Sequence, residues 1–590
     1  MATDPTDPTT RLSILHIVLE DFSTLGSSVF ASPHSTATPS TPNLARLAAR
    51  GTIFQRAFCQ APICNPSRTS FMTSRRPGTT RVLTNDDEYH ASVPPGLPTL
   101  VDFLRASDPA ASVACASGSK LFHIACDHDA MGLDVSQDSP PPIASLPQPL
   151  RNAARFILQP DAPHSADRNR ALTALARLLT YRTHRRRFYL GVGFVETHAF
   201  NEQVCHLEIL PPWTRRHSPT APPSRGRERL PPLITWPNFD FWRSRTDAEQ
   251  RRAIGDYYLC ASHVDGTVGA LVGSLDALNL SRTTAVVVQG DHGYSLGLHG
   301  RWSKYSLFED ATRVPLLIVV PGGVRGRAVD DVVESLDVVP TLLDLWGVPS
   351  QPAVTPQGAD RSVTTTSRYT TSPSSSYWLA RSDDRSAAVT GGLESVQGQY
   401  VQLDGLALTQ YLTVGAATSS GRMHIGAPAP SARARRRRYA RSELHLPCGL
   451  GCCMLNSPYD GLPPGYTRTP RVGPVVQLYI RTRRWAYTAV LRGTLRPDHT
   501  APIGGAKSAP PAAPLQLIDE LLFDHRADPT ESDNLAYYAP QRPMVHSMRA
   551  AALRDWSVPL SASPPPNSSR AQRAEWLREL TGYRRNWWKR

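Results

Sequence analysis

The stretch LSILHIVL, residues 12–19, followed at once by Glu20 and Asp21, decides the expected fold. The run is apolar almost throughout, which is typical of a strand that is buried on both faces. Similar runs rich in valine, isoleucine, leucine and aromatic residues occupy Ser112–Ala116, Phe188–Phe194, Thr284–Val288 and Leu316–Val320. Between them, Ile254–Leu278 has the longer period of a helix. This alternation predicts an α/β fold with a large, mostly parallel sheet flanked by helices.

A first helix is expected soon after the first strand, between Thr41 and Gly51. Thr41 suits the N-cap, Pro42 suits the first turn, and Gly51 suits the position just past the end.

Changes in composition divide the chain into five expected parts. They are a flexible N-terminus (1–11), the α/β domain (12–348), low-complexity and Arg-rich insertions (349–441), a strand-rich C-terminal subdomain (442–556) and a basic tail (557–590). Within the insertions, Ser350–Ser386 is rich in serine, threonine and proline, and Ala427–Arg441 is rich in arginine; Pro211–Pro232 is a further Pro/Arg-rich loop. The strands expected in the subdomain are Val475–Ile480, Arg484–Leu491 and Leu521–Phe523, followed by a helix around Met544–Trp556.

The overall composition excludes several classes of protein. Of the 590 residues, 40% are hydrophobic and 19% charged, so a sizeable core can form and global disorder is excluded. The net charge is 64 − 50 = +14, which favours anionic partners. No apolar stretch reaches 18 residues, so no membrane span is expected. Residues 1–11 are polar, and no signal peptide is visible there.

Two local clusters suggest functions that we do not favour. Cys448, Cys452 and Cys453 lack the second close pair that a structural zinc site needs, so they are expected to be buried or loop thiols. The run Arg435–Arg438 is typical of a solvated loop, and no nucleic-acid-binding fold signature accompanies it. We therefore expect no nucleic-acid partner.

Polar residues follow four of the expected strands. In open α/β sheets the functional site lies outside the carboxyl ends of the strands. The residues found there are Glu20 and Asp21, then Lys120 and His123, then Glu196 and His198, and finally Asp291 and His292. Each pair alone would be unremarkable in a solvated loop or as a structural hydrogen-bonding group. Together they predict one site, because four strands deliver acid, lysine and histidine to one edge of the sheet.

The residue types in this set indicate the chemistry. Glu20, Asp21, Asp291 and His292 offer three carboxylates and an imidazole, which favour a hard cation such as Ca²⁺ or Mg²⁺ over zinc. Lys120, Lys304 and His198 add positive charge and protons. A cation with basic side chains suits a tetrahedral anion, either phosphate or sulfate.

The candidate nucleophile is Cys64, in the segment CNPSRTS at residues 64–70. Pro66 fits the first turn of a helix, which places Cys64 near a helix N-terminus, where the dipole and Arg68 lower the pKa of a thiol. A soft thiolate, however, matches a hard cation with carboxylate ligands poorly. The mismatch suggests that the working group at position 64 is an oxygen species.

The Cys-x-Pro-Ser-Arg segment resembles the signature of type I sulfatases, in which the cysteine is converted to Cα-formylglycine. The flanking segments look like the iduronate-2-sulfatase subfamily: FQRAF (54–58), TSRRP (73–77), KLFH (120–123), DHGYSLG (291–297) and WSKYS (302–306). The late segments LFD (522–524) and PTE (529–531) match family landmarks. The resemblance covers roughly residues 12–555, and its combined motifs are highly specific.

The resemblance implies an alkaline-phosphatase-like sandwich and a set of roles for individual residues. Calcium would be bound by Glu20, Asp21, Asp291, His292 and the modified Cys64. Arg68 would hold the formylglycine, Lys120 and His123 would contact its hydrate and the sulfate, and His198 and Lys304 would bind sulfate and help protonate the leaving group. The implied partners are a formylglycine-generating enzyme and a sulfated sugar or glycosaminoglycan, with iduronate 2-sulfate ends as the leading substrate. The implied compartment is lysosomal or secretory, although no signal peptide is visible.

This chain departs from the family pattern at Glu20, where the family usually has Asp, and at Gly290, where it commonly has Ser or Thr. Glu20 keeps an oxygen ligand but is one methylene longer, which shifts the geometry of the metal site. Two alternatives therefore stay open. One is a phosphate or phosphonate monoester hydrolase on the same fold, and the other is a catalytically silent protein that binds sulfated polysaccharide.

Overall fold

A computed structural model describes residues 12–30, 39–123, 133–135, 146–157, 166–198, 246–348, 350–352, 375–380, 398–412, 439–446, 475–492 and 515–556. Several predicted features lie outside the described residues: the N-terminus (1–11), the Pro211–Pro232 loop, Arg435–Arg438, the cysteine cluster at 448–453 and the tail (557–590).

Nine strands of the described chain form one large sheet in the order β11-β2-β10-β6-β1-β5-β3-β4, with β9 paired to β2. The bounds are β1 Ser13–Leu19, β2 Thr52–Phe58, β3 Ser112–Cys115, β4 Asp134–Val135, β5 Phe188–Phe194, β6 Thr284–Gly290, β9 Arg313–Val314, β10 Leu316–Val319 and β11 Arg327–Glu334. β1 pairs in parallel with both β5 and β6, and β3 pairs in parallel with β5. The predicted, mostly parallel sheet is confirmed, and the carboxyl ends of these four strands lie at one edge. β10 runs antiparallel to β6 and β2.

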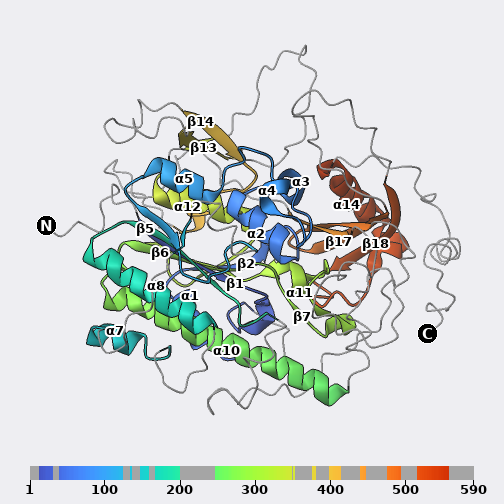
Figure 1. Ribbon diagram of the computed structural model, residues 1–590. Coiled ribbons are helices and arrows are strands. Elements are labelled where there is room, and N and C mark those ends of the chain that lie inside the picture. Colours follow the sequence, from blue (N-terminus) through green and yellow to red (C-terminus); the bar gives the residue numbers. More distant parts are fainter. Residues whose placement is uncertain are drawn as a thin grey trace, which may run out of the picture.

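Helices cover both faces of this sheet (Figure 1). α2 (Cys64–Thr73), α5 (Leu100–Ser107) and α12 (Val338–Trp346) lie on one face; α1 (Pro42–Ala48), α7 (Gln148–Ala153), α8 (Ala166–Thr183) and α10 (Asp247–Ala277) lie on the other. Ile14 and Val18 of β1 belong to the first core, whereas Leu15, Ile17 and Leu19 belong to the second. β1 is therefore apolar along its length because alternate side chains enter different cores.

The helix expected between Thr41 and Gly51 is α1, but two of its boundary signals act differently. Thr41 occupies the N-cap without a side-chain capping bond, because its hydroxyl bonds the hydroxyl of Ser27 at 2.6 Å. The prediction that Gly51 terminates the helix is wrong, since the helix ends at Ala48. A Cβ at Gly51 would instead collide with the carbonyl of Ile318, so glycine is needed there for the close approach of β10.

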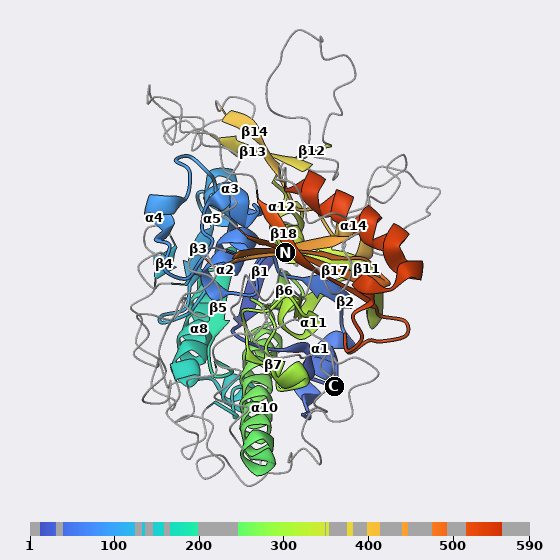
Figure 2. The same ribbon diagram turned by 90° about the vertical axis from the view of Figure 1, so that its right-hand side faces the viewer.

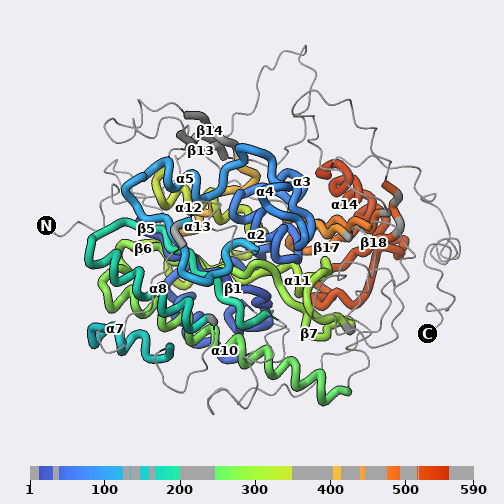
Figure 3. Tube along the Cα trace, in the orientation of Figure 1, coloured from blue at the N-terminus to red at the C-terminus, as the bar shows by residue number. Residues whose placement is uncertain are grey.

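The C-terminal subdomain is a four-stranded antiparallel sheet of β15 (Ala440–Leu446), β16 (Val475–Arg481), β17 (Trp485–Arg492) and β18 (Gln516–Asp524), followed by α14 (Arg542–Asp555). It lies at the side of the large sheet with α14 on its outer face (Figures 2 and 3). Its inner face packs against Phe58, Ile63 and Phe308 of the α/β domain.

An ion-pair network also joins the two parts. Glu309 of α11 (Glu309–Thr312) accepts from Arg481 Nε at 2.6 Å and lies 3.2 Å from His525 Nδ1. The backbone N–H of Glu309 donates to Glu531 at 2.8 Å. The late family landmark at residues 529–531 thus docks the subdomain onto the α/β domain.

The predicted 349–441 insertion contains regular structure. A small sheet of β12 (Ser350–Pro352), β13 (Ser375–Ala380) and β14 (Gly398–Leu403) lies in it, followed by the short helix α13 (Thr409–Leu412). Leu408, Tyr411 and Leu412 are buried in the same core as α12. β15 also begins inside the predicted arginine-rich segment, at Ala440.

Further short elements include the helices α3 (Pro77–Thr80) and α4 (Tyr89–Ser92) and the hairpin of β7 (Ser295–Leu296) and β8 (Trp302–Ser303). Among the described residues, no helix has the length and apolarity needed to cross a membrane.

Candidate active site

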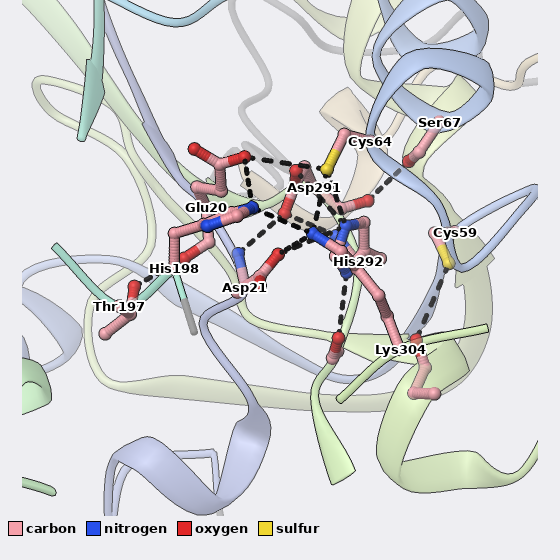
Figure 4. Close-up of polar contacts among 12 residues, drawn as sticks. Glu20, Asp21, Cys59, Cys64, Ser67, Thr197, His198, Asp291, His292 and Lys304 are labelled. Carbon is pink, nitrogen blue, oxygen red and sulfur yellow. Dashed lines mark hydrogen bonds and ion pairs between the residues drawn. The ribbon is translucent and has the colours of Figure 1, made fainter. Parts of the chain in front are cut away.

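Most of the polar residues predicted at the strand ends meet in one cluster (Figure 4). Glu20 and Asp21 follow β1, His198 follows β5, Asp291 and His292 follow β6, Lys304 follows β8, and Cys64 begins α2. Cys64, Asp21, Asp291 and His292 are buried, while the His198 side chain keeps 24% of its surface exposed. The structure therefore brings these residues together at the strand ends, and the His198 side chain is partly exposed to solvent.

A strained turn sets the position of Asp21. Its φ is +52°, a left-handed conformation that costs energy for a residue with a side chain. The turn is held because the Asp21 N–H donates to Asp291 Oδ1 at 3.0 Å, and the Tyr257 hydroxyl donates to the Asp21 carbonyl at 2.7 Å. Tyr257 comes from α10, and nothing in its sequence context indicated this role.

Cys64 is the first residue of α2, as predicted. Its Sγ lies 3.0 Å from Lys304 Nζ, 3.4 Å from His292 Nε2 and 3.5 Å from Glu20 Oε1. Burial alone would raise the pKa of the thiol, but the charges of Lys304, Lys120 and His292 hold it well below its usual range. A side-chain hydrogen bond from His123 acts in the same direction. The local field therefore favours an anion at position 64.

Arg68 is fully buried and links two parts of the site. Its Nε donates to Asp291 Oδ2 at 3.1 Å, and its Nη1 donates to the backbone carbonyl of Lys120. Ser67 donates its hydroxyl proton to the Asp291 carbonyl. The role of Arg68 in holding a formylglycine stays a prediction, since its hydrogen bonds go to Asp291 and the 120–121 backbone.

His292 is oriented by its own backbone neighbour. Its Nδ1 donates to the Gly293 carbonyl at 2.8 Å, which turns Nε2 toward Cys64 and toward Asp21 Oδ1 at 3.3 Å. Burial would lower the pKa of His292, but Asp291 and Asp21 raise it to about 9. Without a cation, the imidazole is charged at neutral pH.

Two lysines lie against the carboxylates. Lys304 donates to Asp21 Oδ1 at 2.8 Å and lies 3.2 Å from His198 Nε2, whereas Lys120 pairs with Glu20. Burial would raise the pKa of Asp21, but Lys304, His198 and His292 outweigh it and lower that pKa. Glu196, which was predicted in the strand-end set together with His198, does not join the cluster; its carboxylate bonds His263 instead.

The donor set fits a hard cation. Asp21, Asp291 and His292 place ligand atoms within 4.8 Å of one another and of Cys64, and Glu20 and Asp21 do so with Cys64 and His198. Asp21 Oδ2 is buried and accepts no hydrogen bond within the described part of the chain. A buried carboxylate oxygen without a donor is costly, and a bound cation would satisfy it.

The segment that carries Lys120 lies directly on β5. A Cβ at Gly193 would collide with the Lys120 backbone, and one at Gly191 would collide with the Leu121 side chain. The sequence patterns had not led us to predict a role for Gly191 and Gly193. Glycines inside the strand run FYLGVGF (188–194) were nevertheless a signal of close backbone approach.

Replacing Gly193 by alanine should lower activity by roughly 10- to 100-fold, because the Lys120 backbone must move away from the cluster. Overpacking should also cost about 1–3 kcal/mol of stability. Steady-state kinetics and thermal unfolding would measure both effects. The control is Gly273→Ala in α10, where the added Cβ meets Ala153 at an ordinary 3.6 Å and activity should be unchanged. Wild-type kinetics in Gly193→Ala would contradict this account of the segment.

Comparisons with known proteins find related chains. A family model described as Sulfatase matches residues 13–348. Iduronate 2-sulfatase of Mus musculus is 29% identical over 374 residues, which cover 53% of this chain and 65% of that protein. Choline-sulfatase of Rhizobium meliloti is 27% identical over 336 residues, covering 52% of this chain and 63% of that protein. The chain thus matches less than two thirds of the length of these relatives.

Solved structures show the same fold over most of the chain. A 2-O GAG sulfatase superposes with a TM-score of 0.58 at 17% identity, covering 92% of this chain and 91% of that one. The phosphonate monoester hydrolase of Silicibacter pomeroyi superposes with a TM-score of 0.54 at 16% identity, covering 92% and 95%. The fold is therefore alkaline-phosphatase-like, as predicted.

Proposed function

This chain belongs to the sulfatase family, and on that premise we propose that it hydrolyses sulfate monoesters with residue 64 as the nucleophile. The observation that carries the proposal is the position of Cys64. It begins α2 within the Cys-x-Pro-Ser-Arg segment, and its Sγ lies among Lys304, His292 and Glu20. Such a position suits an oxygen nucleophile that must face an anionic ester between basic side chains.

In this proposal Cys64 is converted to formylglycine by a formylglycine-generating enzyme, so Sγ marks the place of the aldehyde hydrate. The hydrate supplies two hydroxyl groups, one to take the sulfate from its ester and one to release it. Lys120 and Lys304 bind the sulfate oxygens and offset their charge. His198, which lies 3.2 Å from Lys304 Nζ and is partly exposed, gives a proton to the leaving oxygen.

We also propose that Glu20, Asp21, Asp291 and His292 hold one calcium ion beside residue 64. The support is the donor set, the unsatisfied Asp21 Oδ2 and the preference of Ca²⁺ for oxygen ligands. When bound, the cation supplies positive charge next to the transferring group. Lys304 and Lys120, which now pair with Asp21 and Glu20, then become available for sulfate.

The proposed substrate is a sulfated acidic sugar of the iduronate 2-sulfate type at the end of a glycosaminoglycan. The support is the similarity to iduronate 2-sulfatases and the motif spacing at Lys120 and His123. The net charge of +14 adds long-range attraction for polyanions, although any sulfated polymer would feel it.

One substrate panel tests the function. Enzyme co-expressed with a formylglycine-generating enzyme should show its highest kcat/KM on 2-sulfated iduronate ends. The comparison substrates are other sulfated sugars, choline sulfate, an aryl sulfate and a phosphonate monoester. A preference for choline sulfate or the aryl ester would overturn the proposed substrate but leave the sulfatase activity standing. A preference for the phosphonate would show that the enzyme hydrolyses phosphonate esters rather than sulfate esters. If protein that carries formylglycine bound sulfated polysaccharide but hydrolysed none of the substrates, the proposed enzymatic activity would be wrong.

A further inference from the structure

We propose that Asp167 and Arg170 of α8 are a positioning pair that holds the loop bearing His198 and the loop bearing Lys120 in fixed positions relative to each other. The inference rests on the proposed function, because it assigns the pair a task in presenting those two side chains to the sulfate ester. Both residues lie at the beginning of α8, beside the carboxyl ends of β3 and β5.

Asp167 determines how the chain leaves β5. Its carboxylate accepts from the Val195 N–H at 2.9 Å and from the Glu196 N–H at 2.8 Å, and its side chain is fully buried. The His198 N–H in turn donates to the Val195 carbonyl at 2.9 Å. One carboxylate therefore fixes the start of the tight turn that ends at His198.

Arg170 connects the same carboxylate to the neighbouring loop. Its Nη1 pairs with Asp167, and its Nε donates to the Gly118 carbonyl. Gly118 has φ +69° and lies two residues before Lys120. Since Lys120 N–H also donates to the Gly193 carbonyl at 3.3 Å, the 118–120 segment is held by both α8 and β5.

The electrostatics explain why the two residues belong together. Burial and the charge of Glu196 raise the pKa of Asp167 to about 7, while Arg170 and the two backbone N–H groups act against that rise. Without Arg170, a fully buried carboxylate would lose its charged partner. The same turn is tied elsewhere by Thr197, which donates to the Glu20 carbonyl, and by the Glu196–His263 pair.

Asp167→Asn should lower kcat by about 10- to 100-fold and change KM less. An amide whose oxygen takes the place of Oδ2 still accepts from the backbone N–H groups, but its NH2 group faces Arg170, so the ion pair is lost and His198 is held less firmly. A double-mutant cycle identifies the route of the effect. In a His198→Ala background, Asp167→Asn should cost less than about 3-fold, since the side chain that Asp167 positions is gone, while Arg170 can still donate to the Gly118 carbonyl on the Lys120 side. Hydrogen exchange of amides 195–198 should accelerate in Asp167→Asn irrespective of turnover.

Asp108→Asn is the matched control. Asp108 pairs with Arg187 at 2.9 Å and joins the same two strands, β3 and β5, at their opposite ends. It should change stability but leave kcat unaltered. Arg170→Gln provides a second variant if Asp167→Asn does not fold, and it should lower kcat in the same direction.

Wild-type kcat in both Asp167→Asn and Arg170→Gln would overturn the positioning role. The role would also be overturned if the loss of kcat in the Asp167→Asn/His198→Ala double variant equalled the product of the losses in the two single variants. If the wild-type protein hydrolysed no sulfate ester at all, the proposed function would fail. The exchange rates of amides 195–198 would still decide whether the pair holds the turn.

Discussion

Cys64→Ala should abolish sulfate-ester turnover, with a loss on the order of 10³-fold or more, while the protein remains folded. The substitution removes the proposed nucleophile and only one buried sulfur atom. Cys64 makes its polar contacts with side chains of the cluster rather than with a distant part of the core. Steady-state kinetics on a sulfated sugar and a thermal unfolding curve would check both halves of the expectation.

The chain offers an internal control for this experiment. Cys59 is also buried, but its sulfur lies toward the Ala311 carbonyl, so Cys59→Ala should keep near wild-type turnover. Trypsin cleavage after Arg56 and Arg68 gives one peptide that contains both cysteines. After treatment with a thiol reagent, Cys59 should be alkylated and residue 64 should not. An unmodified Cys64 thiol throughout an active preparation would rule out the formylglycine mechanism.

Removing the metal site should have the second-largest effect. Chelation of calcium, Asp21→Asn and Asp291→Asn should each lower kcat by roughly 100-fold or more, because each removes the cation or a charged oxygen ligand. Calcium should also raise the unfolding temperature of the wild-type protein and not that of the two variants, since a ligand bound only to the folded state stabilises it. This second readout does not depend on turnover.

Glu20→Asp keeps the charge at position 20 but shortens the side chain, so it tests how the reach of this carboxylate affects calcium binding. Glu20 now reaches Lys120, and the shorter carboxylate should be tolerated or should bind calcium more tightly. Asp265→Asn is the control for losing a buried carboxylate: Asp265 holds the start of α1 through the N–H groups of Asn43 and Leu44. It should lower stability without changing calcium dependence. The ligand assignment is wrong if chelation and the ligand substitutions leave both kinetics and unfolding temperature unchanged.

Local sequence patterns were sufficient for the central strands and for the composition of the site. β1, β5 and β6 are mostly apolar because both faces of each strand are buried, and this is visible without knowing their neighbours. The residues that follow these strands, and Cys64 before Pro66, could be identified because strand ends and helix starts are local features. Parallel pairing then brings those ends together whatever the order of the strands.

The edge of the sheet was less predictable. β2 (TIFQRAF) and β11 (RAVDDVVE) carry charged residues among apolar ones, so neither was predicted as a strand. They pair with each other in parallel, although about 275 residues separate them in the sequence. The antiparallel direction of β10 likewise depends on its partners, β6 and β2, rather than on its own four residues.

The sequence by itself thus determined the α/β class, the strand-end residues and the helix-start cysteine, because each depends on burial or backbone geometry within a few residues. Only the tertiary structure decided that Tyr257 holds the Asp21 turn, that Gly193 admits the Lys120 segment, and that Glu196 turns away to His263. Each of these contacts joins residues 67 or more positions apart. Their energies depend on distances of a few tenths of an ångström, which only the packed chain defines.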